Sequence, residues 1–168
     1  MILSYSQLQE IVEQGVMTNV APDQINAASI DITVGSVFFV EEDPKSAVSR
    51  HAPPFRARIG DTAEERIAPR MRRVEVPRGG SLVLQPGQVA LAQSEQVFNL
   101  PKNLSCKYLE KSSMGRTFLG HMMAGWCDAG WNGSVLTLEL KNETQFHEIE
   151  IPVGVRIGQM IFFPHAEV

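Results

Sequence analysis

The chain has 168 residues, of which 43% are hydrophobic and 20% are charged, so it is long and apolar enough to bury one core. Its formal net charge of −4 argues against binding to nucleic-acid polymers, which requires a basic surface, although a few Lys and Arg side chains can still hold a small anion. No N-terminal apolar run resembles a signal peptide, and no stretch reaches the length of a membrane span. We therefore expect a single cytoplasmic domain over residues 1–168, without nucleic-acid or membrane partners.

The N-terminal part predicts one short helix followed by a strand. Apolar residues recur at helical spacing over residues 4–14, and Ser6 is a candidate N-cap. Residues 25–40 then alternate between apolar and polar side chains, which is typical of a strand, with an expected break at residues 35–36.

The remainder of the chain predicts a long loop and then many short strands. Residues 41–80 are rich in Pro and Arg, and we expect a surface excursion that carries one or two short strands. Further on, apolar runs are separated by Gly, Pro and Asn turns. The predicted strands cover residues 81–84, 89–92, 97–98, 106–109, 119–123, 135–140, 149–151 and 156–163. This pattern predicts an all-β sandwich or barrel.

Glu139 is the first candidate for catalysis. On a strand over residues 135–140, three Leu side chains point to one face, and Glu139 shares the other face with Val135 and Thr137. A strand glutamate is ordinarily a solvated surface residue. A partly apolar surface would instead raise its pKa, which suits a group that carries protons.

Two further segments have both a functional and a purely structural interpretation. Residues 111–116 combine two hydroxyls, a glycine and two cations, a composition that can hold phosphate oxygens or can form an ordinary surface loop. Asp128 precedes Ala-Gly, so it is either a turn residue or a ligand for a sugar hydroxyl. Asp31 is similarly ambiguous, with strand-end bonding as its structural role, and we expect Trp131 to lie in the core.

Several reaction classes lack their motifs. There is no His-x-Glu with Pro-Cys-x-x-Cys, so a zinc nucleoside deaminase is unsupported, and neither a Walker motif nor a Gly-x-Gly-x-x-Gly loop is present. Cys106 and Cys127 have no metal-type spacing, and we expect both to be buried free thiols.

Taken together, the polar motifs resemble the dCTP deaminase branch of the dUTPase superfamily, from about residue 25 to residue 163. The motifs that carry the resemblance are Ile25–Asp31, Leu84–Ala92, Lys111–Arg116, Ala124–Trp131, Thr137–Leu140 and Arg156–Gln159. The forms Ser-Ser-x-Gly-Arg-x-Phe-Leu and Ala-Gly-Trp-x-Asp-Ala-Gly are most similar to the members that also cleave dUTP to dUMP.

The resemblance implies a fold, an assembly and a reaction. The implied fold is a distorted jelly-roll or β-barrel of the dUTPase-like type with a short N-terminal helix, assembled as a homotrimer with sites at the subunit boundaries. The implied reaction is hydrolytic deamination of dCTP to dUTP and ammonia without a catalytic metal, with Mg²⁺ carried by the triphosphate and no zinc. The alternatives are a bifunctional deaminase that forms dUMP, a diphosphatase for dUTP or modified pyrimidine triphosphates, and an inactive nucleotide-sensing trimer.

The resemblance also implies roles for individual residues. Glu139 is the general base and acid, and Ser112 and Arg116 hold the water and the glutamate. The implied substrate-binding residues are Lys111, Ser113, Met114 and Gly115 at the triphosphate, Ala124 at the pyrimidine edge, Asp128 at the 3′-hydroxyl, Thr137 and Leu138 beside the base, and Gln159.

Three departures from the family pattern carry expectations of their own. The segment from Arg116 to Asp128 is one residue shorter than usual, and the segment from Gly133 to Glu139 is one residue longer. Together they predict a compensating shift or a β-bulge. The family's closing tail with Tyr, Lys and Gln does not precede Val168, from which we expect weaker binding, leakage of water into the site, a different substrate or a cover supplied by a partner.

Overall fold

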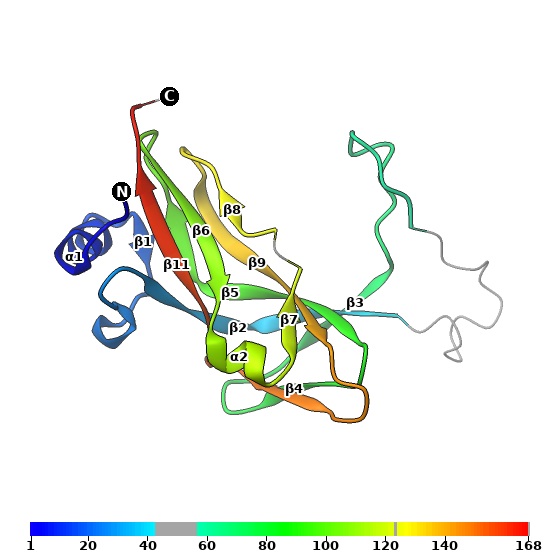
Figure 1. Ribbon diagram of the computed structural model, residues 1–168. Coiled ribbons are helices and arrows are strands. Elements are labelled where there is room, and N and C mark those ends of the chain that lie inside the picture. The colour runs from blue at the N-terminus through cyan, green and yellow to red at the C-terminus, as the bar shows by residue number, and fades with distance from the viewer. Residues whose placement is uncertain (43–56, 123, 168) are drawn as a thin grey trace.

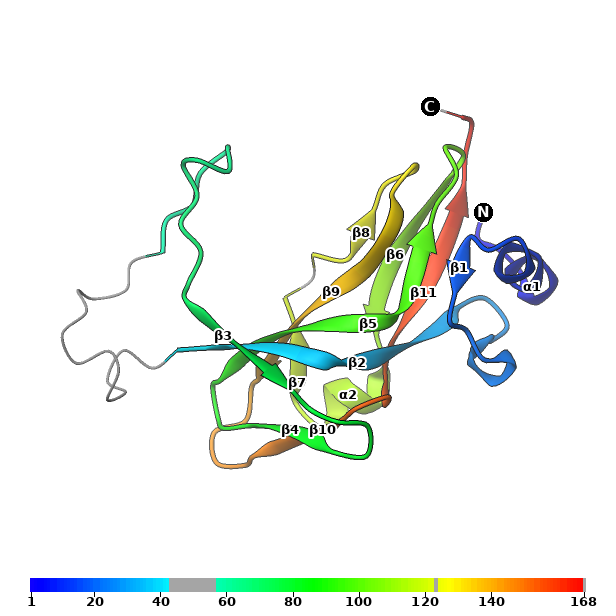
Figure 2. The ribbon, with the colours of Figure 1, turned by 180° about the vertical axis from the view of Figure 1, so that it is seen from behind.

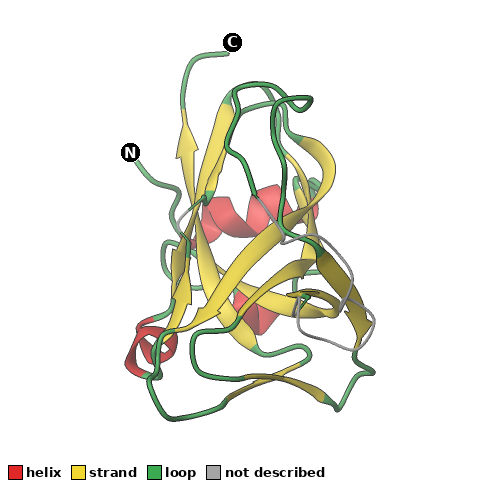
Figure 3. Ribbon diagram, turned by 90° about the vertical axis from the view of Figure 1, so that its right-hand side faces the viewer, coloured by secondary structure: helices red, strands yellow, loops and turns green. Residues whose placement is uncertain are grey.

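The fold is a strongly curled β-sheet with a small second sheet at one end and a short helix at its side (Figures 1 and 2). The computed structural model describes residues 1–42, 57–122 and 124–167. Strands are the main regular structure of the described residues, and the helical segments are few and short (Figure 3). The all-β half-barrel with an N-terminal helix confirms the predicted fold class.

Nine strands form the large sheet, in the order β7-β9-β5-β2-β11-β6-β8, with β1 added to β5 and β3 added to β2. Strands β10 and β4 form the small sheet. The strand bounds are β1 Met17–Thr18, β2 Ile30–Glu41, β3 Met71–Glu75, β4 Ser81–Leu84, β5 Val89–Asn99, β6 Leu104–Glu110, β7 Leu119–His121, β8 Trp126–Cys127, β9 Asn132–Asn142, β10 Ile149–Pro152 and β11 Arg156–Pro164. The helical segments are α1 Tyr5–Glu13, η1 Pro22–Gln24 and α2 Ser112–Arg116.

The N-terminal helix begins earlier than its predicted cap. Ser4, rather than Ser6, is the N-cap of α1, and the side chain of Gln7 accepts a hydrogen bond from the Ser4 backbone N–H at 3.0 Å. This bond gives the Ser4 N–H a hydrogen-bond partner at the start of the helix, where backbone N–H groups have no partner within the helix itself. The apolar face of α1 is anchored by Leu8, which is completely buried.

Strand β2 differs from its prediction in its start and its continuity. It begins at Ile30 and runs on to Glu41, and the expected break at residues 35–36 is a shift in register against β5 within a continuous strand. Asp31 and Thr33, the polar members of the alternating pattern, are both buried. Their polar atoms are satisfied by side chains from distant parts of the chain, and local alternation cannot reveal such partners.

The long loop and strand β5 account for the other differences. Strand β5 is one element where two short strands were predicted. In the predicted excursion, β3 pairs with β2 and Arg58 forms an isolated bridge with Ile67, whereas residues 43–56 lie outside the described residues. The expected bulge near Gly133 coincides with a register shift between β5 and β9, where Gly133 has a φ of 66°.

The core lies inside the curl of the large sheet, and it fixes the two faces of β9. Leu136, Leu138 and Leu140 are buried in it as predicted, which leaves Glu139 on the other face. Trp131 packs against the core and stacks on Phe98 with ring centroids 5.3 Å apart.

The two thiols are buried and free, as expected, and they lie directly opposite each other on β6 and β8. No helix among the described residues has the length and apolar character needed to cross a membrane.

Candidate active site

Glu139 lies in β9 with its carboxylate largely withdrawn from solvent. Its side chain is 22% exposed, and its Oε2 atom is buried without a hydrogen-bond partner among the described residues. The backbone N–H of Ala124 donates a hydrogen bond to the carboxylate. Burial raises the pKa of Glu139, and the Ala124 hydrogen bond opposes that rise. The result is a carboxylate that can exchange a proton and has an oxygen available to a ligand.

Two aromatic side chains stand next to this carboxylate. Nε2 of His121 lies 3.8 Å from Oε2 of Glu139, which is beyond hydrogen-bond distance, and the His121 ring packs on Tyr108 with centroids 4.5 Å apart. Burial lowers the pKa of His121, which favours the neutral imidazole. Neither residue was predicted to belong to the site, because the sequence around His121 offers no partner at short range.

Tyr108 owes its position to a glycine. A Cβ atom at Gly158 would lie 2.0 Å from the Tyr108 ring, so only glycine allows the ring to lie this close to β11. Burial raises the pKa of the Tyr108 phenol, with the charge of Glu110 adding to the effect. Its hydroxyl is buried and lacks a hydrogen-bond partner within the described part of the chain. The glycine of the Arg-Ile-Gly-Gln motif therefore supports the group of side chains that ends at Glu139.

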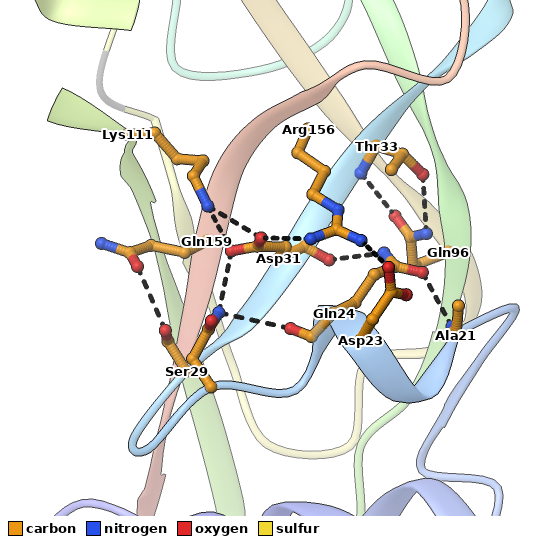
Figure 4. Close-up of polar contacts among 11 residues, drawn as sticks. Ala21, Asp23, Gln24, Ser29, Asp31, Thr33, Gln96, Lys111, Arg156 and Gln159 are labelled. Atoms are coloured by element: carbon orange, nitrogen blue, oxygen red, sulfur yellow. Dashed lines mark hydrogen bonds and ion pairs between the residues drawn. The ribbon is translucent and has the colours of Figure 1, made fainter. Parts of the chain in front are cut away.

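Two predicted substrate-binding residues lie in the region around Asp31: Lys111 bonds to Asp31, and Gln159 bonds to Ser29 (Figure 4). Nζ of Lys111 lies 2.7 Å from each carboxylate oxygen of Asp31. Gln159 is directly opposite Asp31 in the pairing of β11 with β2, and its Oε1 accepts a hydrogen bond from Ser29 at 3.1 Å. These contacts assemble a second polar group from segments that are distant in the sequence.

The residues predicted to form a phosphate-binding loop instead form one helical turn, α2, which begins after Lys111. Ser112, Gly115 and Arg116 are exposed, and Ser113 and Met114 are half-buried. Among the described residues, no hydrogen bond or ion pair joins Ser112 or Arg116 to Glu139.

Three further candidates lie on or near β9. Oδ1 of Asp128 accepts a hydrogen bond from the indole N–H of Trp126 at 2.8 Å, and its carbonyl accepts one from the backbone of Trp131, so it has the predicted turn role. Thr137 is exposed on the same face as Glu139, whereas Leu138 is completely buried in the core.

Tyr108 and Asp31 lie on opposite faces of the ribbon formed by β6 and β11. Tyr108, which touches His121, points to the buried face, and its neighbour Leu109 points to the other face. Leu109 pairs with Gln159, which in turn pairs with Asp31. Within one chain the sheet therefore separates Tyr108 from Asp31.

The described residues contain no group of three or more His, Cys, Asp or Glu side chains arranged to hold a metal ion. The described residues form an apolar cavity of about 380 Å³ between α2 and β10. Two other cavities, of about 600 and 730 Å³, lie around Arg78 and are more polar than the first. Glu139 does not line any of these three.

Comparison with known proteins agrees with this fold and these motifs. The family described as dCTP deaminase-like matches residues 2–165, so the chain belongs to this family, which is a family of deaminases. The chain is 32% identical over 166 residues to "dCTP deaminase, dUMP-forming" of Methanospirillum hungatei, covering 97% of this chain and 81% of that protein. It is 32% identical over 167 residues to the protein of the same name from Thermobifida fusca, covering 97% and 78%.

A solved structure supports the fold. The 2′-deoxycytidine 5′-triphosphate deaminase from Agrobacterium tumefaciens superposes with a TM-score of 0.69 at 20% identity. The match covers 96% of this chain and 47% of that one, so this chain spans about half of its length. The motif resemblance to dCTP deaminases is thereby confirmed at the level of family and fold.

Proposed function

We propose that this chain catalyses the hydrolytic deamination of dCTP, with Glu139 as the general base and acid. The observation that carries the proposal is the Glu139 carboxylate. It accepts a hydrogen bond from the Ala124 amide, burial raises its pKa, and one of its oxygens has no hydrogen-bond partner among the described residues. A carboxyl group with a raised pKa holds a proton more readily than an ordinary carboxylate, which suits a group that accepts a proton and then returns it. The family membership and the names of the relatives support dCTP as the substrate.

In the proposed reaction, Glu139 takes a proton from the water that attacks C4 of cytosine and delivers it to N3. It then takes the proton of the new hydroxyl and delivers it to the amino group, which leaves as ammonia while C4 becomes a carbonyl carbon. No metal takes part in these transfers. Ala124 has its backbone at the carboxylate, which supports a place for the pyrimidine edge beside it.

We further propose that each site is completed by a second copy of the chain, in a homotrimer. Two observations support this arrangement: among the described residues no hydrogen bond or ion pair joins Glu139 to α2, and the sheet separates Asp31 from Tyr108, which contacts His121 beside Glu139. In this proposal Ser112 and Arg116 of a neighbouring copy hold the attacking water and the carboxylate, and satisfy the open Glu139 oxygen.

The remaining predicted residues bind the nucleotide. Lys111, Ser113 and the backbone of Met114 and Gly115 hold the triphosphate, which carries its own Mg²⁺. Asp128 faces the 3′-hydroxyl, and Thr137 borders the base. Leu138 contributes only by placing its neighbours, because its side chain belongs to the core. Gln159 makes a further nucleotide contact.

We propose dUMP as the end product, in place of the dUTP expected first. The relatives are named as dUMP-forming, and the Ala-Gly-Trp-x-Asp-Ala-Gly motif had already favoured this alternative. Deamination would consume one water and release ammonia, and a second water would then cleave dUTP to dUMP and pyrophosphate.

The test is to incubate the protein with dCTP and Mg²⁺, and separately with dUTP and Mg²⁺, while ammonia and pyrophosphate are measured independently. Ammonia and pyrophosphate from dCTP are expected. Ammonia alone would restore dUTP as the product, and pyrophosphate from dUTP without ammonia from dCTP would indicate a diphosphatase. Binding of dCTP without either product would indicate a nucleotide sensor and would overturn the proposed activity.

A further inference from the structure

Asp31 is an acidic side chain on β2 that is almost completely buried, with only 3% of its side chain exposed. Buried carboxylates are rare unless they are paired. Both of its oxygens lie 2.7 Å from Nζ of Lys111, and Oδ1 also accepts a hydrogen bond from Asn26 at 2.9 Å (Figure 4). The guanidinium of Arg156 lies 3.7 Å from Oδ2. Asp31 therefore brings together β2, β11 and the junction between β6 and α2.

The position of Lys111 makes this contact more than a surface ion pair. Lys111 is the N-cap of α2, and its carbonyl accepts hydrogen bonds from the backbone N–H groups of Met114 and Gly115. Its own backbone N–H is directed at the carbonyl of Ile157 in β11. Fixing the side chain of Lys111 thus also fixes the residue from which the helical turn starts.

The ammonium group keeps capacity for a ligand. A lysine ammonium has three N–H donors, and two of them can be directed at the Asp31 carboxylate. The side chain of Lys111 remains 28% exposed, so the third donor can reach an anion from outside. On the same face, Gln159 lies directly opposite Asp31. The side chains around Asp31 therefore hold two of the proposed nucleotide ligands in fixed relative positions.

We propose that Asp31 is a positioning residue: it holds Lys111, and with it the start of α2, in the geometry that binds the triphosphate. This inference rests on the proposed function, in which Lys111 contacts the phosphates. Asp31 itself does not touch the substrate. Its effect must therefore pass through Lys111 and must increase with the number of phosphates on the ligand.

The central test is Asp31→Asn, which retains an acceptor for Asn26 and removes the negative charge beside Lys111. The KM for dCTP is expected to rise about tenfold with kcat within about twofold, while binding of dCMP stays unchanged because it lacks the outer phosphates. Asp23→Asn is the matched control, since Asp23 pairs with Arg156 in the same group of residues but is exposed and does not contact Lys111. A merely structural role for Asp31 would lower the melting temperature without an effect that depends on phosphate number.

A second variant shows whether Asp31 acts through Lys111. In a Lys111→Gln background, adding Asp31→Asn should no longer change the KM, because the group that Asp31 positions is gone. If Asp31→Asn does not yield folded protein, Asp31→Glu retains the charge but displaces the ammonium, and it should raise the KM in the same direction. Equal KM values for wild type and Asp31→Glu or Asp31→Asn would overturn the inference.

Binding of inorganic tripolyphosphate, measured by calorimetry, separates this inference from the proposed function. If the wild type binds tripolyphosphate more tightly than Asp31→Asn but does not deaminate dCTP, the proposed reaction fails and the positioning role stands. If the wild type deaminates dCTP and both proteins bind tripolyphosphate equally, the reaction stands and the positioning role fails. Absence of tripolyphosphate binding by the wild type would also overturn the positioning role.

Discussion

Nε2 of His121 lies 3.8 Å from Oε2 of Glu139, at the end of a line of contacts that begins where Tyr108 packs against Gly158. The imidazole is buried and its pKa is lowered, while the pKa of the carboxyl group is raised. Both shifts have burial as their main cause and both favour the uncharged form. Groups whose charged forms are disfavoured by their surroundings are characteristic of sites where protons move.

Glu139→Gln should make the protein more stable at pH 8 than the wild type and no more stable at low pH. The pKa of Glu139 is raised above its ordinary value of 4.5, so the folded protein keeps this proton to a higher pH than the unfolded chain. Below pH 4.5 Glu139 is protonated in both the folded and the unfolded wild type. As the pH rises through the folded-state pKa, the wild type loses stability, whereas the Glu139→Gln variant has no proton to lose at this position and keeps its stability. Melting temperatures at pH 4 and pH 8 measure this, with Glu10→Gln on the exposed face of α1 as the control. An equal effect of Glu139→Gln on the melting temperature at both pH values would show that burial does not raise the pKa of Glu139.

The same variant should lose ammonia release from dCTP while keeping nucleotide binding. An amide has the shape of the carboxyl group but cannot carry a proton between water, N3 and the leaving amine, so kcat should fall by about 10²–10⁴-fold. Ammonia production and dCTP affinity are measured on the same preparation. Deamination by Glu139→Gln at a rate similar to the wild type would show that another group is the base.

His121→Phe should shift the acidic limb of the kcat profile to higher pH and lower kcat less than Glu139→Gln does. Phenylalanine can retain the packing on Tyr108, but it removes the polar nitrogen beside Glu139. The ionised form of Glu139 is then less favourable, so its pKa rises further. The measurement is kcat for ammonia release between pH 5 and pH 9. His147→Phe, on the exposed loop before β10, is the control and should leave the profile unchanged. An unaltered profile for His121→Phe would remove His121 from the site.

Two inactive variants should restore activity when they assemble together. If each site takes Glu139 from one copy and Arg116 from the next, every mixed trimer of Glu139→Gln and Arg116→Ala chains has one boundary with both native residues. Random assembly from equal amounts should therefore regain about one quarter of the wild-type activity, since about three quarters of the trimers are mixed and one site in three is intact. Mixing Glu139→Gln with the double variant Glu139→Gln/Arg116→Ala is the control. No recovery in the first mixture would show that the sites are not shared.

Local patterns in the sequence predicted much of the fold and part of the candidate site. Alternation placed Glu139 and the leucines of β9 on opposite faces, and the structure agrees, because each strand contacts the core along its length. The contact between Asp31 and Lys111 could not be predicted in this way, since 80 residues separate them. The same holds for His121 and Tyr108, whose contact is created by the pairing of strands and by the small size of Gly158.

Gly158→Ala tests whether this contact geometry is required. The added methyl group would lie 2.0 Å from the Tyr108 ring, so the ring must move from β11 towards His121. Such overpacking usually costs about 1–3 kcal/mol of stability, and the displaced ring should also lower kcat by disturbing the side chains beside Glu139. Urea unfolding measures the first effect and ammonia release the second. Gly115→Ala is the control for unfolding, because a Cβ there meets no atom within 4 Å and alanine favours the helical turn. If Gly158→Ala unfolds at the same urea concentration as the wild type, Tyr108 has room to adjust, and the close packing on β11 is not what keeps His121 beside Glu139.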